Sequence, residues 1–186
     1  MKIFPTWFLQ IAVALALLLL SGGALLAQDE QKVDDLFAQF QGEKPDWERI
    51  ENQILEIWSQ SGSDAMDLLL ERGRKALEDG DFPKAVEHFS ALIDHAPEFA
   101  EGYNMRATAY FLMGKYGLSI GDVQRTLALN PRHFGALSGL GIMLEEIGDK
   151  PHALEAFKAA QALHPFRDDV NDAIKRLEKQ TAGSAL

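Results

Sequence analysis

Residues 80–97 read GDFPKAVEHFSALIDHAP, and the stretch returns as GKYGLSIGDVQRTLALNP at 114–131 and as GDKPHALEAFKAAQALHP at 148–165. Each copy begins with a glycine and ends with a proline, and both landmarks recur every 34 residues. A glycine ends a helix without Cβ strain, whereas a proline cannot continue one. Two kinds of helix breaker in one register predict a helix between them, and the fixed period predicts a repeat protein.

When the 34-residue period is extended to both sides of these stretches, the sequence divides into repeats at 66–99, 100–133 and 134–167. Their length and residue pattern resemble the tetratricopeptide repeat family. The matching residues are Leu69, Tyr103 and Leu137 at position 4, Gly73, Ala107 and Gly141 at position 8, Ala76, Tyr110 and Leu144 at position 11, Ala85, Ser119 and Ala153 at position 20, and Phe89, Val123 and Phe157 at position 24. The resemblance implies an all-α, right-handed superhelical solenoid of helix-turn-helix repeats with a C-terminal capping helix.

Each position has a physical role in such a fold. Small residues at positions 8 and 20 let the first helix of a repeat, helix A, approach the second, helix B. Large residues at positions 4, 11 and 24 fill the space between hairpins. A single repeat cannot bury its own apolar face, so three stacked repeats are expected to share a continuous core.

The region 168–186 is expected to form the capping helix and a loose tail. Asp168 is a candidate N-cap. The apolar residues that follow lie at helical spacing, as one stripe that covers the last repeat. The stripe consists of Val170, Ala173, Ile174 and Leu177.

Residues 28–63 predict a helical hairpin before the first repeat. Asp46 is a candidate cap for its second helix, which carries Ile50 and Ile54 on one face. Ser63 lies 34 residues before Pro97, in phase with the repeats. We therefore interpret the hairpin as a degenerate repeat that caps the N-terminal end.

The first 27 residues have the layout of a secretory signal: one positive charge at Lys2, an apolar run over 8–20, and small residues before a cut after Ala27 or Ala24. The alternative is an uncleaved anchor, because the 18 residues from Ile3 to Leu20 are at the short end of a membrane-spanning helix. The cleaved form is expected in the bacterial periplasm, without membrane contact. The anchored form is expected on the inner membrane, facing the periplasm.

Composition excludes several classes of partner and site. The formal net charge of −10 disfavours nucleic acid, which needs a basic footprint. The absence of cysteine excludes disulfides, thiolate metal sites and a cysteine nucleophile.

No pattern in the sequence predicts a catalytic residue, a metal site or a cofactor, so the protein is not expected to be an enzyme. Gly135, Gly139 and Gly141 fall inside a predicted helix with no strand before it, so they do not form a phosphate-binding loop. No histidine stands three or four residues from another, and all are interpreted as surface or loop residues. They are His88, His95, His133, His152 and His164.

The resemblance also implies a ligand groove along the A helices, in which acids outnumber bases. Asn104 and Thr108 are expected to hydrogen-bond a peptide backbone, and Phe111, Ile142 and Leu70 to provide apolar anchors. Gly135 and Gly139 would let the peptide backbone approach the helix closely. Packing between neighbouring helices is the competing interpretation of the same residues. The candidate groove residues are Arg74, Glu101, Asn104, Thr108, Phe111, Gly135, Ser138, Ile142 and Glu145.

One use of the family is not implied. Members that bind chaperone C-terminal tails carry a clamp of Lys and Asn in the first repeat and of Lys and Arg in the third. This chain has Leu70 and Arg74, then Gly135 and Gly139, at those places.

The sequence therefore predicts a non-enzymatic scaffold for cell-envelope assembly or integrity, whose partner is a protein or peptide that is basic or neutral at the contact. The alternatives are an anchored assembly factor and self-association through an exposed repeat edge.

Overall fold

The computed structural model describes residues 29–40, 42 and 45–183, and every regular element within these ranges is a helix. The predicted signal segment 1–27 and the last residues of the predicted tail lie outside them. The chain divides into two compact units, with the boundary between Ile57 and Trp58. The predicted all-α solenoid is confirmed in the second unit.

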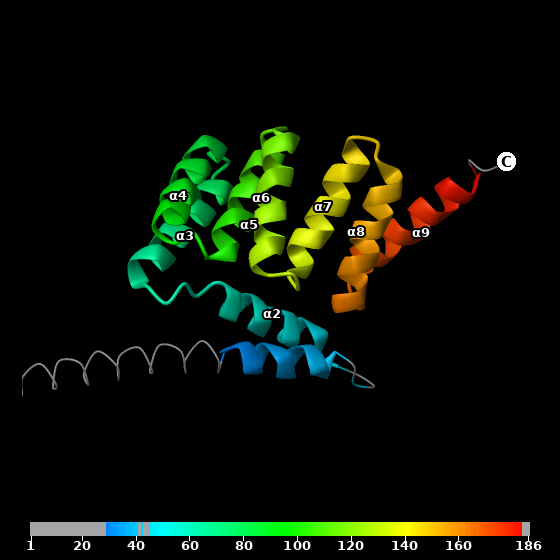
Figure 1. Cartoon of the computed structure of the whole chain (residues 1–186), viewed down its shortest axis with the longest axis horizontal. Coiled ribbons are helices and arrows are strands. Elements are labelled where there is room, and N and C mark those ends of the chain that lie inside the picture. The colour runs from blue at the N-terminus through cyan, green and yellow to red at the C-terminus, as the bar shows by residue number, and fades with distance from the viewer. Residues whose placement is uncertain (1–28, 41, 43–44, 184–186) are drawn as a thin grey trace, which may run out of the picture. The chain divides into compact units, whose positions relative to one another are not determined.

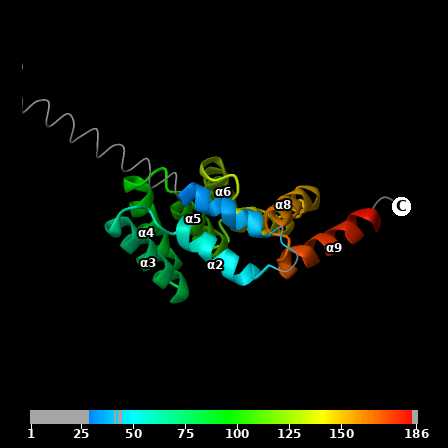
Figure 2. The ribbon, with the colours of Figure 1, turned by 90° about the horizontal axis from the view of Figure 1, so that it is seen from below.

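The first unit contains a helix over residues 29–39 and most of α2 (Trp47–Trp58). The two helices lie side by side in both views (Figures 1 and 2). The carboxylate of Asp46 accepts a hydrogen bond from the backbone of Arg49 at 3.3 Å, as the predicted cap requires. Both helices bury apolar side chains, Val33 and Leu36 in the first and Ile50 and Ile54 in α2, and Phe40, just after the first helix, is buried as well.

The second unit is a row of helical hairpins followed by one last helix, in chain order across Figure 1. Contacts between consecutive helices run through the whole row from α3 to α9. The helices are α3 (Asp64–Glu78), α4 (Phe82–His95), α5 (Ala100–Leu112), α6 (Tyr116–Leu129), α7 (Phe134–Glu146), α8 (Lys150–Leu163) and α9 (Asp168–Gly183).

The glycine landmarks make the turns between helices A and B. Gly80, Gly114 and Gly148 have φ values of 77°, 70° and 87°, in the left-handed region that a side chain disfavours. In two of the repeats an aspartate follows the glycine and caps helix B: Asp81 accepts from the backbone of Lys84, and Asp149 from that of His152.

Helices A and B meet most closely where a glycine faces a phenylalanine. A Cβ added to Gly73 would overlap the ring of Phe89, and one added to Gly141 would lie 2.7 Å from the ring of Phe157. Both rings are buried. The small position 8 and the large position 24 of one repeat are therefore direct partners.

The middle repeat joins its helices with polar contacts as well. Arg106 of α5 donates to Asp122 of α6 through Nε at 2.7 Å and Nη2 at 2.8 Å, and to Ser90 of α4 at 3.1 Å. The hydrogen bond to Asp122 raises the pKa of Arg106, which keeps the guanidinium charged. One side chain thus links three helices.

α9 covers the end of the row, and its predicted stripe is buried against Ala153, Phe157 and Ala160 of α8. Two details differ from the sequence prediction. The helix already includes Asp168, because the backbone N–H of Asn171 bonds to the carbonyl of Arg167. It also continues to Gly183, into the segment predicted to be loose, since no glycine or proline interrupts it earlier.

Within the described ranges, no helix has both the length and the apolar character needed to cross a membrane. The predicted anchor, Ile3 to Leu20, falls outside those ranges.

Candidate functional site

α3, α5 and α7 are the A helices of the three repeats, and α5 contacts both of the others. The surface they form is called the A-helix face below. A cavity of about 200 Å³ opens on this face in the middle of the row. It is lined from α5 by Asn104, Ala107, Thr108 and Phe111, from α6 by Ser119 and Val123, and from α7 by Gly135, Ala136, Gly139, Ile142 and Met143.

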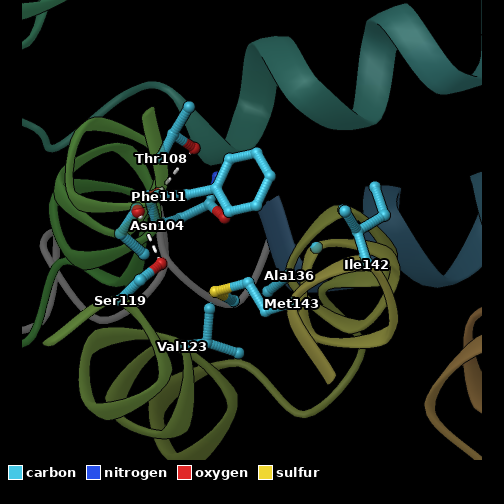
Figure 3. A pocket seen from close by; sticks show the side chains of 11 residues that line it. Asn104, Thr108, Phe111, Ser119, Val123, Ala136, Ile142 and Met143 are labelled. Atoms are coloured by element: carbon cyan, nitrogen blue, oxygen red, sulfur yellow. Dashed lines mark hydrogen bonds between the residues drawn. The ribbon is translucent and has the colours of Figure 1, made fainter. Parts of the chain in front are cut away.

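The cavity has a buried floor and an accessible mouth. Ala107, Val123 and Met143 are at most 3% exposed and form the apolar floor. At the mouth, Ile142 is 42% exposed and Phe111 is partly exposed. Figure 3 shows Phe111 extending from α5 toward α7, with Val123 and Met143 coming from α6 and α7. Such a concave, mainly apolar site suits an apolar side chain.

The hydroxyl groups that line the cavity already use their protons within the protein. Ser119 donates to the carbonyl of Ala107 at 2.6 Å, and Thr108 donates to the carbonyl of Asn104 at 3.1 Å. A hydroxyl has one proton and two lone pairs, so both side chains retain only acceptor capacity.

A buried carboxylate lies beside the cavity. Glu101 is 5% exposed and accepts from Arg74 at 3.0 Å and from Asn104 at 3.1 Å. Arg74 also donates to Ser59 at 2.7 Å. These contacts link α3 to α5. The side chain of Glu101 is buried within them, whereas that of Arg74 remains 30% exposed.

His133 completes this network. It lies in the loop before α7, in keeping with the interpretation of the histidines as surface or loop residues, but its side chain is buried. It is 1% exposed, and its Nδ1 accepts the backbone N–H of Ala136 at 3.1 Å, which caps α7. Nε2 lies 3.1 Å from Glu101, and Trp58 stacks on the ring at 4.7 Å. His164 is also 1% exposed, with its ring 5.1 Å from Phe134.

The other groove candidates have structural partners. Ser138 is buried and donates to the carbonyl of Phe134 at 2.9 Å. Glu145 accepts from Arg176 of α9 at 2.7 Å. Leu70, placed at a groove position by the repeat pattern, is 1% exposed and belongs to the core of the first repeat.

The structure therefore brings five of the nine candidates together around the cavity: Asn104, Thr108, Phe111, Gly135 and Ile142. Sequence reasoning missed the floor of the cavity. A signal was present, because position 24 is Val123 in the middle repeat and phenylalanine in the other two. It also missed His133, since a local pattern cannot show a partner 32 residues away.

Among the residues that the structure describes, no group of three histidine or acidic side chains is placed to hold a metal ion. The buried carboxylate of Glu101, which accepts from the cavity residue Asn104, is engaged by three side chains.

Comparisons with known proteins agree with this architecture. The family profile described as tetratricopeptide repeat matches residues 70–122 and 104–168. A TPR repeat-containing protein of Rhizobium etli is 34% identical over 157 residues, which cover 83% of this chain and 77% of that protein. The small glutamine-rich tetratricopeptide repeat-containing protein 2 of Saccharomyces cerevisiae is 29% identical over 133 residues, or 72% of this chain and 38% of that protein.

Solved structures share the fold at low sequence identity. The first TPR of Spaghetti, bound to an HSP90 peptide, gives a TM-score of 0.61 at 21% identity, covering 63% of this chain and 93% of that one. The Yersinia enterocolitica secretion chaperone SycD, in complex with a peptide of the translocator YopD, gives 0.60 at 16% identity, covering 64% and 96%. With its repeats, its stacked hairpins and these relatives, the chain belongs to the tetratricopeptide repeat family.

Proposed function

We propose that this protein is a non-enzymatic adaptor that binds a peptide segment of another protein across its A-helix face. The observation that carries the proposal is the cavity of about 200 Å³ between α5, α6 and α7, with its apolar floor and open mouth. The Spaghetti and SycD structures were both solved with a bound peptide, which supports the same class of ligand here.

The proposed partner is basic or neutral at the contact. The chain carries a formal net charge of −10, and Glu78 and Glu146 are exposed on two of the A helices. Complementary charge would speed the encounter and disfavour acidic competitors. This differs from the acidic HSP90 peptide SRMEEVD of the Spaghetti complex.

The binding proposal is tested by affinity capture from an envelope extract, with the wild-type protein and the variant Phe111→Ala/Ile142→Ser as baits. Both substitutions remove apolar surface from the mouth of the cavity. The control is Leu118→Ser, because Leu118 is 54% exposed on α6 and does not line the cavity. We expect a partner that the control retains and the mouth variant loses. A partner that binds all three baits equally would move the site away from this face.

We also propose that the protein works outside the cytoplasm, in assembly or maintenance of the bacterial envelope. The support is the amino-terminal pattern of Lys2, the apolar run and the small residues up to Ala27. N-terminal sequencing of the native protein distinguishes cleavage after Ala27 or Ala24 from an intact anchor. Recovery of an intact, cytosolic protein would contradict export.

A further inference from the structure

The first and third repeats each place an aromatic ring between helices A and B, directly against the backbone of a glycine. The pairs are Gly73 with Phe89 and Gly141 with Phe157. Both rings are at most 2% exposed, so in each of these repeats the chain fills this place with its own side chain.

The middle repeat has Ala107 and Val123 at the same two positions, and both line the cavity. Valine has no ring to fill the space that phenylalanine fills in the neighbouring repeats. A cavity of about 150 Å³ with apolar walls is known to admit benzene. The cavity here, about 200 Å³, has room for an aromatic ring with a small polar tip.

The hydrogen-bonding capacity of the walls narrows the choice of ring. The hydroxyl groups of Ser119 and Thr108 donate to backbone carbonyls, so toward an occupant of the cavity they can only accept hydrogen bonds. An occupant that carries a donor, such as a phenol O–H or an indole N–H, gains a hydrogen bond here that a plain phenyl ring cannot make.

The negative charge of this protein favours basic residues on either side of the aromatic residue in the partner. Glu146 lies one turn beyond the mouth residue Ile142 on α7 and is exposed, so the two share one face of that helix. A chain with a formal net charge of −10 attracts a segment with lysine or arginine next to the ring.

We propose that the cavity receives one tyrosine or tryptophan side chain from a basic segment of the partner protein. The partner thereby supplies the ring that Phe89 and Phe157 supply internally in the other repeats. This inference rests on the proposed adaptor function and names the side chain that anchors the partner.

The direct test uses indole, phenol and toluene as probes in a methyl NMR titration of the purified protein. The reporters are methyl groups on the walls of the cavity: Ala107, Val123, Ala136, Ile142 and Met143. We expect saturable shifts with indole and phenol, and binding at least threefold weaker with toluene. The absence of shifts at these methyls would overturn the proposal, as would equal binding of toluene.

Two variants fill the cavity in different ways. Ala107→Gly/Val123→Phe rebuilds the glycine–phenylalanine pair of the other repeats. Gly139→Leu fills the cavity from α7, where an added Cβ has nothing within 4 Å. Its matched control is Gly121→Leu, an exposed site on α6 that is equally open and does not line the cavity. We expect at least tenfold weaker indole binding in any folded filling variant, with the control unchanged. A folded filling variant that keeps full affinity would overturn the proposal.

A peptide experiment separates this inference from the adaptor function itself. The probe is Lys-Ala-Lys-Tyr-Ala-Lys-Ala, with analogues that carry Trp, Phe or Ala in place of Tyr. We expect the Tyr and Trp peptides to bind about two- to tenfold more tightly than the Phe peptide, as for one hydrogen bond, and the Ala peptide to bind most weakly. If all four bind equally and Phe111→Ala/Ile142→Ser weakens all four, the groove functions without an aromatic anchor. The natural partner can be tested in the same way. If Phe111→Ala/Ile142→Ser loses the partner in the capture experiment and Gly139→Leu retains it, the natural partner also binds the groove without an aromatic anchor.

Discussion

Glu101 is a buried carboxylate that is hydrogen-bonded to the cavity residue Asn104. It is 5% exposed, and its carboxylate receives Arg74, Asn104 and His133. A buried charge is tolerated only when its hydrogen bonds are satisfied. The three donors come from α3, α5 and the cap of α7, so this single side chain links all three A helices.

We therefore predict that Glu101→Ala lowers the free energy of unfolding by about 2–3 kcal/mol, because the buried His133 and the partly buried Arg74 and Asn104 lose a charged acceptor. The control is Glu71→Ala. Glu71 also pairs with Arg74, at 3.2 Å, but its side chain is 67% exposed. An exposed pair contributes about 0–1 kcal/mol. Urea unfolding measures the stability of both variants. Equal losses would mean that the buried network stabilises the protein no more than the exposed ion pair does.

A second residue-scale prediction concerns positions 8 and 24 of the middle repeat. Val123→Phe alone is expected to destabilise the protein by about 1–3 kcal/mol, because its ring would meet the Cβ of Ala107. In the other repeats the matching glycines leave no space for a Cβ beside the ring. Adding Ala107→Gly should recover most of this loss. A double-mutant cycle measured by thermal unfolding gives the coupling energy between the two positions. Additive effects would show that the introduced ring does not pack against residue 107.

At the scale of one element, α6 differs from the other B helices. It carries Gly117 and Gly121, both exposed, and an added Cβ at either meets nothing within 4 Å. Gly117 lies in the first turn of α6 and Gly121 in its interior, where a glycine weakens a helix by about 0.5–1 kcal/mol relative to alanine. The helix that forms one wall of the cavity is therefore intrinsically weak.

Gly121→Ala is expected to raise the free energy of unfolding by about 0.5–1 kcal/mol, and Gly117→Ala, in the first turn, to raise it by less. Gly114→Ala is the contrasting control. Its φ of 70° lies in the left-handed region, so a side chain there is strained and the protein should be destabilised. Chemical denaturation of the three variants checks the signs. A stabilising Gly114→Ala would contradict the turn geometry.

For the molecule as a whole, stability depends on the covering of each repeat by its neighbour. α9 covers the last repeat, and Leu177 is 0% exposed within that contact. Leu177→Ala should cost about 2–5 kcal/mol, as deletions of buried leucine do. Lys179→Ala, on the exposed side of the same helix, should change stability by less than about 0.5 kcal/mol. Differential scanning calorimetry compares the two, and similar midpoints would mean that α9 does not act as a cap.

Local chemistry was enough to predict the repeat. Glycine at 80, 114 and 148 and proline at 97, 131 and 165 act on the backbone within one or two residues, so their effect can be read from the sequence. The stripe of α9 could be predicted for the same reason, because helical spacing alone decides which residues share a face.

Tertiary structure decided the site. The candidates for the groove share one helix face, but only the packing shows that Arg74 and Glu101 engage each other and that Glu145 engages Arg176. The cavity lies where α5, α6 and α7 meet, and Val123 is part of its floor. Volume is a property of all the walls together, so the repeat pattern fixes where the helices lie, while the assembled side chains decide what space is left between them.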